Sequence, residues 1–239
     1  MKISASGEHL YQLTRMWAFN CYLVREEDGF TLVDTNLPGS AEAIVKAAQS
    51  LQAPIARILL THAHGDHVGS VDALHALLPE AEVIISARDA RFLKGDRSLD
   101  ANEPQVKLRG SYQVIATTPT RLLQPGERVG SLEAVASAGH TPGHLAFLDV
   151  RDRSLIAGDA FQTQGGLAVA GVIRPLFPLP AMATWHLELA LSSARALRAL
   201  EPARMAVGHG PVLEAPLAAM DRAIAAAQAN VERHASHAA

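Results

Sequence analysis

The 239-residue sequence predicts an α/β protein, and three of its features lead to this prediction. Short apolar runs alternate with segments whose apolar residues recur at helical spacing. The same order of strands followed by helices returns in the second half of the chain, without a detectable sequence repeat. The hydrophobic fraction of 49% beside 19% charged residues is ordinary for a globular protein, so a well-packed core is expected.

In the first half of the chain, each expected strand is an apolar run bounded by turn residues. Each expected helix keeps its apolar residues three or four positions apart. The elements are expected in this order: two strands within residues 20–34 joined by a Glu-Asp-Gly turn, a helix ending near Leu51, a strand at 57–60, a helix ending at Pro79 and a strand at 83–85.

In the second half, a polar segment with little periodicity precedes the next elements and is expected to be a long loop. The order is this loop at 94–112, strands near 132–138, 145–150 and 154–158, a helix over 182–200, a strand at 203–207 and a helix over 215–234. No Gly/Ser-rich linker separates the halves. We therefore expect one domain over residues 1–239, with two packed αβ halves of approximately residues 1–118 and 119–239.

Bulk properties exclude some kinds of site and disfavour some classes of partner. The net charge is −3 and no block of Lys and Arg occurs, so no nucleic-acid partner is expected. The single cysteine, Cys21, excludes a disulfide within the chain and a thiolate metal cluster, and it is expected to be a small core residue. Neither a signal-peptide pattern nor an apolar run of membrane-spanning length is visible. The expected location is the cytoplasm, without a membrane partner.

The densest chemical signal is His62-Ala63-His64-Gly65-Asp66-His67, directly after a predicted strand. Imidazoles and carboxylates are costly to bury together unless a cation neutralises them, and they are ligands of zinc, iron or manganese. His62 and His64 can share one metal, while Asp66 and His67 project toward a neighbouring position. Six residues cannot complete two coordination spheres, so further ligands are expected elsewhere.

Three later motifs each place a metal-binding side chain after an apolar strand. They are Ala-Gly-His-Thr-Pro-Gly-His with His140, Ala-Gly-Asp-Ala with Asp159, and Gly-His-Gly-Pro with His209. A small residue before each ligand lets the backbone approach closely, and strand ends are where α/β proteins build sites. The residues themselves therefore predict a metal site assembled from separate segments.

In this order, the motifs resemble those of the metallo-β-lactamase superfamily. The segments Asn-Cys-Tyr-Leu at 20–23 and Leu-Val-Asp-Thr at 32–35 fit the same pattern, so the resemblance spans about residues 9–215. It implies a four-layer αββα sandwich with the site at one edge, between two β-sheets. It also implies a metal-dependent hydrolase.

The resemblance further implies a site for two divalent ions, with zinc expected and iron or manganese as alternatives. A hydroxide shared by the two ions would attack the substrate without a covalent enzyme intermediate. The implied ligands are His62, His64 and His140 for the first metal, Asp66, His67 and His209 for the second, and Asp159 bridging both.

Other residues receive supporting roles. Asp66 is also expected to orient the hydroxide, and Asp34 to orient a ligand histidine. His144 is expected behind the ligands, with a substrate-facing residue and a polar strand residue as alternatives.

The segment 161–185 follows Asp159 and mixes glycines with large apolar residues. It is expected to be an apolar substrate wall or lid, or alternatively a packing contact that includes a homodimer interface. The candidate substrate-binding residues are Phe161, Leu167, Phe177 and Trp185.

The expected reaction is hydrolysis of a small ester, thioester or lactone. The motifs are similar to those of glyoxalase II and of acyl-homoserine-lactone hydrolases. However, only residues 210–239 follow His209, where glyoxalase II carries a helical domain, and Phe161-Gln162 stand where the lactonases usually carry a tyrosine. The alternatives are a mononuclear iron enzyme resembling persulfide dioxygenases, an RNA phosphodiesterase, and a fold retained as a scaffold.

Overall fold

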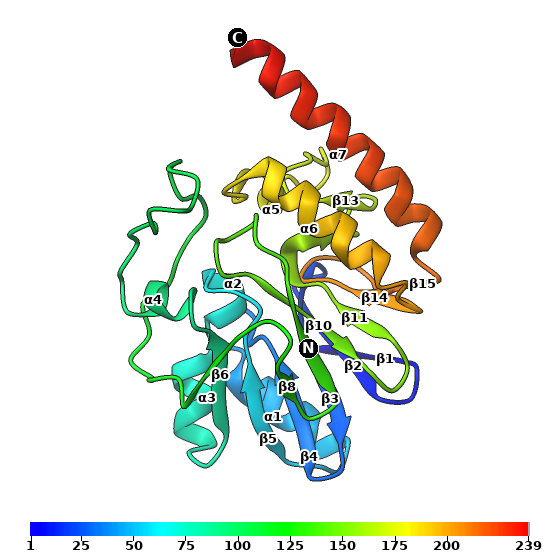
Figure 1. The fold of residues 1–239 in the computed structure, drawn as a ribbon. Helices are drawn as coiled ribbons and strands as arrows, with labels where there is room; N and C mark the ends of the chain where they lie inside the picture. Colours follow the sequence, from blue (N-terminus) through cyan, green and yellow to red (C-terminus); the bar gives the residue numbers. More distant parts are fainter. Residues whose placement is uncertain (239) are drawn as a thin grey trace.

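Two large β-sheets pack face to face in the computed structural model, which describes residues 1–238 (Figure 1). The seven-stranded sheet follows the chain order and consists of β1 (Lys2–Ser6), β2 (Leu10–Arg15), β3 (Phe19–Glu26), β4 (Gly29–Val33), β5 (Ile55–Leu59), β6 (Glu82–Ser86) and β7 (Arg121–Leu123). The six-stranded sheet has the spatial order β15 (Leu213–Glu214), β14 (Arg204–Ala206), β11 (Ser154–Ile156), β10 (Leu145–Asp149), β9 (Leu132–Ala136) and β8 (Arg128–Val129). A small separate sheet pairs β12 (Phe161–Gln162) with β13 (Ala168–Val169).

Most of the helices lie between strands in the chain. The helices are α1 (Ala41–Ser50), α2 (Gly65–Val68), α3 (Val71–Leu77), α4 (Ala90–Leu93), α5 (Leu179–Met182), α6 (Leu187–Ala199) and α7 (Leu217–Ala238), with a 3-10 turn η1 (Gly158–Ala160) after β11. Helix α7 follows the last strand, and α1, α3, α6 and α7 cover the outer faces of the sheets. The chain runs antiparallel from β1 to β4 and parallel from β4 to β7. Parallel neighbours require a crossover, and α1 and α3 lie in the first two of these connections.

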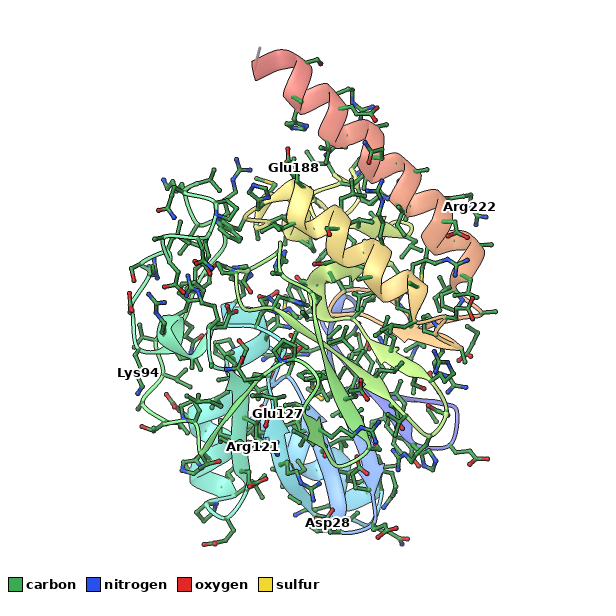
Figure 2. All side chains as sticks on the ribbon, viewed as in Figure 1. Asp28, Lys94, Arg121, Glu127, Glu188 and Arg222 are labelled. Carbon is green, nitrogen blue, oxygen red and sulfur yellow. The ribbon has the colours of Figure 1, made fainter. Side chains whose placement is uncertain are left out.

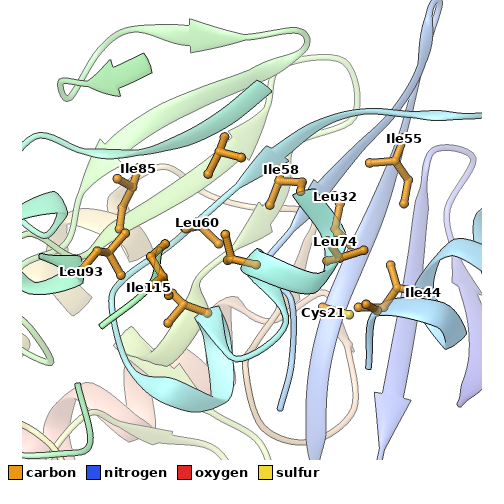
Figure 3. Packing of buried hydrophobic residues seen from close by; sticks show 14 of the residues in the cluster. Cys21, Leu32, Ile44, Ile55, Ile58, Leu60, Leu74, Ile85, Leu93 and Ile115 are labelled. Carbon is orange, nitrogen blue, oxygen red and sulfur yellow. The ribbon is translucent and has the colours of Figure 1, made fainter. Parts of the chain in front are cut away.

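Three hydrophobic clusters define four layers. One fills the space between the two sheets and includes Tyr22 and Leu59 from one sheet and Phe147 from the other. A second packs the outer face of the first sheet against α1 and α3 and includes Leu32, Ile58 and Leu74 (Figure 3). A third packs the six-stranded sheet against α6 and α7. The order helix, sheet, sheet, helix confirms the predicted αββα sandwich.

Strand β3 (Phe19–Glu26) explains why residues 21–24 form one continuous apolar run in the sequence. Successive side chains of a strand point to opposite faces, so a strand buried on both faces has no polar alternation. Cys21 and Leu23 pack in the helix-side cluster, whereas Tyr22 and Val24 pack between the sheets. The prediction that Cys21 is a core residue is confirmed, and burial raises the pKa of its thiol.

The structure corrects several expected boundaries. The hairpin of β1 and β2 was not predicted, and β7 belongs to the first sheet although it follows residue 118. The expected helix over 182–200 begins later, at Leu187, as α6, and the short helix α5 ends at Met182 before it. The His186 imidazole caps the start of α6 by accepting a hydrogen bond from the Leu189 N–H at 3.2 Å. The segment 94–112 forms the expected long loop.

The charged residues Asp28, Lys94, Glu188 and Arg222 are exposed at the periphery (Figure 2). Within residues 1–238, no helix combines the length and apolar character that crossing a membrane requires.

Candidate metal centre

The ends of several strands place the predicted ligands at one edge of the sandwich. The segment with His62, His64, Asp66 and His67 follows β5, and its last part forms the short helix α2. His140 lies between β9 and β10. The η1 turn that follows β11 carries Asp159, and His209 follows β14. Strands β11 and β14 are parallel neighbours, so their carboxyl ends bring Asp159 and His209 to the same edge.

All seven predicted ligands belong to groups whose donor atoms lie within 4.8 Å of one another. The groups also share members: His62 and His67 form a further set with Asp159. Two of these sets are named here, and all seven residues together are called the ligand cluster. The first group is His62, His64 and His140, and the second group is Asp66, His67 and His209.

Asp159 lies between the two groups. Its Oδ2 is 3.4 Å from Nε2 of His140 and 3.2 Å from Nε2 of His209. Its Oδ1 is 3.3 Å from Nε2 of His67. One buried carboxylate therefore approaches imidazoles of both groups, which is the position expected for a bridging ligand.

A second buried carboxylate, that of Asp34, orients His67. Its Oδ2 lies 2.8 Å from Nδ1 of His67, so the Nε2 atom of the ring faces the cluster. The same carboxylate accepts hydrogen bonds from the backbone N–H of Thr61 at 2.9 Å and from its hydroxyl at 2.8 Å. Asp34 thus fixes both a histidine of the second group and the residue that precedes His62.

The rings of the first group are also held from behind. Nε2 of His64 is 3.1 Å from the carbonyl oxygen of Arg109, so Nδ1 of His64 faces Nε2 of His140 at 3.0 Å. The other nitrogen of His140 lies 3.1 Å from the Thr184 hydroxyl. Nδ1 of His62 is similarly 3.0 Å from the Thr61 hydroxyl. Each ring therefore keeps one nitrogen directed into the cluster.

His144 lies behind Asp159. Its Nε2 accepts a hydrogen bond from the Asp159 N–H at 3.1 Å, and its Nδ1 is 2.7 Å from the Ser137 hydroxyl. The ring is buried, with an exposed fraction of 1%. These contacts fit a residue that supports the backbone of Asp159.

Burial makes the first group a set of neutral imidazoles. It lowers the pKa of His64 to about 4 and holds the pKa values of His62 and His140 well below their usual range. Neutral imidazole is the form that binds a metal, so these rings are available as ligands at neutral pH.

The second group has the opposite electrostatics. Burial lowers the pKa of His209, but the charges of Asp159 and Asp66 outweigh this effect and raise it to about 9. Burial raises the pKa of Asp159, yet His209 and His67 hold it well below the usual range for a carboxyl. The site thus concentrates carboxylate charge that a cation could neutralise.

Several nitrogen and oxygen atoms of the ligand cluster are buried without a hydrogen-bond partner. Nε2 of His62, Nε2 of His67 and Oδ1 of Asp159 are buried and make no hydrogen bond within the described part of the chain. Leaving such atoms without a partner is costly, so their convergence fits a bound cation. Nitrogen and oxygen donors without a thiolate suit zinc, iron or manganese.

The cluster opens to solvent beside Asp66. Its side chain is 27% exposed, whereas those of His67, Asp159 and His209 are at most 3% exposed. Water and a substrate can therefore reach the cluster from the Asp66 side.

The four candidate substrate residues lie in different environments. Phe177 contacts the cluster, because its ring centroid is 5.1 Å from that of His209. Trp185 is buried and donates a hydrogen bond from Nε1 to the Val106 carbonyl at 3.1 Å. Phe161 is completely buried in the core of the second half, and Leu167 packs against that core.

Two aromatic residues near the cluster were not predicted. Phe19 has its ring 5.2 Å from His209 and 6.0 Å from Phe177. Trp17 is 67% exposed and meets Phe177 edge-on at 5.8 Å. We call Trp17, Phe19 and Phe177 the aromatic rim. A tryptophan in the turn between two strands was the available sequence signal, but the β2–β3 hairpin was not recognised.

Comparison with known proteins adds to these observations. A model of the metallo-beta-lactamase superfamily matches residues 17–209, a range that contains the whole ligand cluster. Uncharacterized protein YobT of Bacillus subtilis (strain 168) is 50% identical over 219 residues, covering 90% of this chain and 94% of that protein. Probable metallo-hydrolase YflN of the same organism is 28% identical over 227 residues, covering 87% and 85%. The crystal structure of TTHA1623 in a di-iron-bound form has a TM-score of 0.65 and 27% identity, covering 86% of this chain and 94% of that one.

Proposed function

The chain belongs to the metallo-beta-lactamase superfamily, and from this premise we propose that it is a hydrolase working with two divalent metal ions. Its substrate is a small ester, thioester or lactone. The observation that carries the proposal is the pair of adjoining donor groups with Asp159 between them. A similar protein, TTHA1623, is known in a di-iron-bound form, which supports a two-metal site.

In this proposal, the first group holds one ion through Nε2 of His62, Nδ1 of His64 and Nε2 of His140. These are the ring atoms left facing the cluster by the contacts behind them. The second group would hold the other ion, and Asp159 would be available as a ligand to both. Zinc is the proposed metal because it accepts nitrogen and oxygen donors in a compact site.

Two divalent cations bound here would lower the pKa of a water molecule and stabilise negative charge on the attacked carbonyl oxygen. Asp66 is the ligand on the open side, so its carboxylate can accept a hydrogen bond from the attacking water and orient it. The charge of His67 and the hydrogen bond from His209 hold the pKa of Asp66 below its usual range despite burial, which keeps it an acceptor. The buried Asp34 and His144 keep the groups around the reacting atoms fixed.

Metal analysis and a substrate panel test this proposal. We expect two zinc ions per chain, and turnover of esters, thioesters or lactones well above that of bis-(p-nitrophenyl) phosphate. One iron per chain with oxygen consumption on a persulfide would overturn the hydrolase proposal. Preferred turnover of the phosphodiester would instead support a nuclease-like reaction, and a metal-free chain without any turnover would contradict an enzymatic role.

The aromatic rim supports a substrate that carries an apolar group. Trp17 is exposed and contacts Phe177, which in turn contacts His209. Replacing Trp17 with alanine is expected to lower kcat/KM about tenfold for esters with a long or aromatic acyl group, because an aromatic contact worth about 1.4 kcal/mol is lost. Acetate esters and the unfolding temperature should be little affected, since Trp17 is largely exposed.

Met16→Ala is the matched control, because Met16 lies in the same turn and is 61% exposed but carries no ring. Steady-state kinetics across a series of acyl chain lengths measures the effect. Equal losses for short and long acyl groups in Trp17→Ala would argue against a substrate contact at the rim.

A further inference from the structure

Asp89 is a fully buried carboxylate outside the ligand cluster. It follows β6 and precedes α4, and its exposed fraction is 0%. Burial raises its pKa to about 6, although hydrogen bonds to the carboxylate oppose this shift. Within the described chain, no cationic side chain lies at ion-pair distance from it. A buried carboxylate without such a partner lowers stability, so its contacts call for an explanation.

Three hydrogen bonds converge on this carboxylate from two separate loops. Its Oδ2 accepts one from the backbone N–H of Ala63 at 3.1 Å and one from the Thr141 hydroxyl at 2.7 Å. Its Oδ1 accepts one from the backbone N–H of Gly143 at 2.7 Å. The three donors belong to the two loops themselves, and none of them is the side chain of a proposed metal ligand.

The two loops carry the whole first group. Ala63 stands between His62 and His64, and Thr141 directly follows His140. Nδ1 of His64 and Nε2 of His140 are 3.0 Å apart although 76 positions separate these residues in the chain. Asp89 therefore joins the backbone segments whose relative position sets the geometry of the first group.

The packing around Asp89 leaves little freedom. A Cβ atom added to Gly143 would lie 2.6 Å from the backbone nitrogen and from Oδ1 of Asp89, and 2.7 Å from the Ser86 hydroxyl oxygen. That hydroxyl accepts a hydrogen bond from the Asp89 N–H at 3.0 Å. The loop with His140 is thus seated closely on the Asp89 backbone as well as on its carboxylate.

We propose that Asp89 is a positioning residue that clamps the two loops of the first group in the geometry for one metal ion. Asp34 has the corresponding role for the second group, since it contacts His67 directly. This inference rests on the proposed function, because it concerns the metal that the first group would hold. Asp89 would then position the ligands of one ion, and Asp34 a ligand of the other.

Zinc titration of the metal-free protein by calorimetry tests the inference. We expect two bound ions in the unchanged chain. In Asp89→Asn, an amide N–H would face a loop donor, so the affinity for one ion should fall about 10- to 100-fold, the range for residues behind metal ligands. Thr141→Val removes one of the three hydrogen bonds and should lower the affinity for the same ion by a smaller factor. This second variant still tests the inference if Asp89→Asn does not fold.

Double variants identify the affected ion. Added to His64→Ala, which already disables the first group, Asp89→Asn should cause little further loss of zinc affinity. Added to His209→Ala, Asp89→Asn should lower the affinity for the remaining zinc ion by the same 10- to 100-fold factor as in the otherwise unchanged chain. Equal effects in both backgrounds would mean that Asp89 acts only through general stability and would overturn the inference.

Asp149→Asn is the matched control. Asp149 is also a buried carboxylate, but it lies in β10 and pairs with Arg151 at 2.6 Å, away from the cluster. This variant should lower the unfolding temperature without changing zinc affinity. If the unchanged chain binds no zinc, the proposed function itself fails. If it binds two ions and Asp89→Asn binds both as tightly, only the role of Asp89 is refuted.

Discussion

Replacing Asp159 with alanine is expected to abolish hydrolysis, with kcat/KM falling about a thousandfold or more. Asp159 approaches imidazoles of both groups, so its loss would weaken the binding of both of the proposed ions at once. Losing about 4 kcal/mol of the charge stabilisation that metal ions provide corresponds to three powers of ten in rate. Steady-state kinetics with parallel metal analysis measures both effects.

Asp159→Asn separates charge from shape, because the amide has the size of the carboxylate but no negative charge. We expect it to retain more metal than Asp159→Ala while remaining far slower than the unchanged enzyme. Near-normal turnover of Asp159→Ala with a full complement of metal would contradict a bridging role for this residue.

Replacing Asp66 with asparagine is expected to reduce kcat about 10²- to 10⁴-fold, the usual range for a group that orients or receives a proton. The effect on the stability of the metal-free protein should be small, because Asp66 lies on the open side of the cluster and is 27% exposed. Kinetics and thermal unfolding of the same preparation provide the comparison.

Asp221→Asn controls for the change in net charge. Asp221 is an exposed carboxylate on α7, paired with Arg198 at 2.6 Å and remote from the cluster. Its kinetics should match those of the unchanged enzyme. An unaltered kcat in Asp66→Asn would exclude the role proposed for this residue, whatever its stability.

The ligand cluster was predictable from sequence because each of its motifs is local. A metal-binding side chain that follows a buried strand can be recognised without knowing which strands become neighbours. Asp159 is an example, since its carboxylate comes directly after the apolar strand β11. The order of the longer strands and helices, apart from the β1–β2 hairpin and β7, was readable for the same reason, since hydrophobic periodicity is a property of short segments.

Features that depend on distant pairing were not predictable. Phe19 reaches His209 because the Asn20 N–H donates a hydrogen bond to the Gly208 carbonyl at 2.9 Å, across nearly the whole chain. The role of Asp89 depends on contacts with Ala63 and Gly143 that only the folded chain creates. The start of α6 was placed five residues too early because the cap at His186, and not the hydrophobic periodicity, sets where this helix begins.

The two sheets contribute unequal parts of the ligand cluster, so metal binding would affect the resistance of the folded chain to proteolysis. The segment after β5 supplies four ligands from one side of the sandwich, and the segments around β10, β11 and β14 supply three from the other. Bound ions would act as cross-links between halves of the chain, adding their binding free energy to the resistance against opening. A cell short of metal would then contain a chain that is not merely idle but also easier for proteases to degrade.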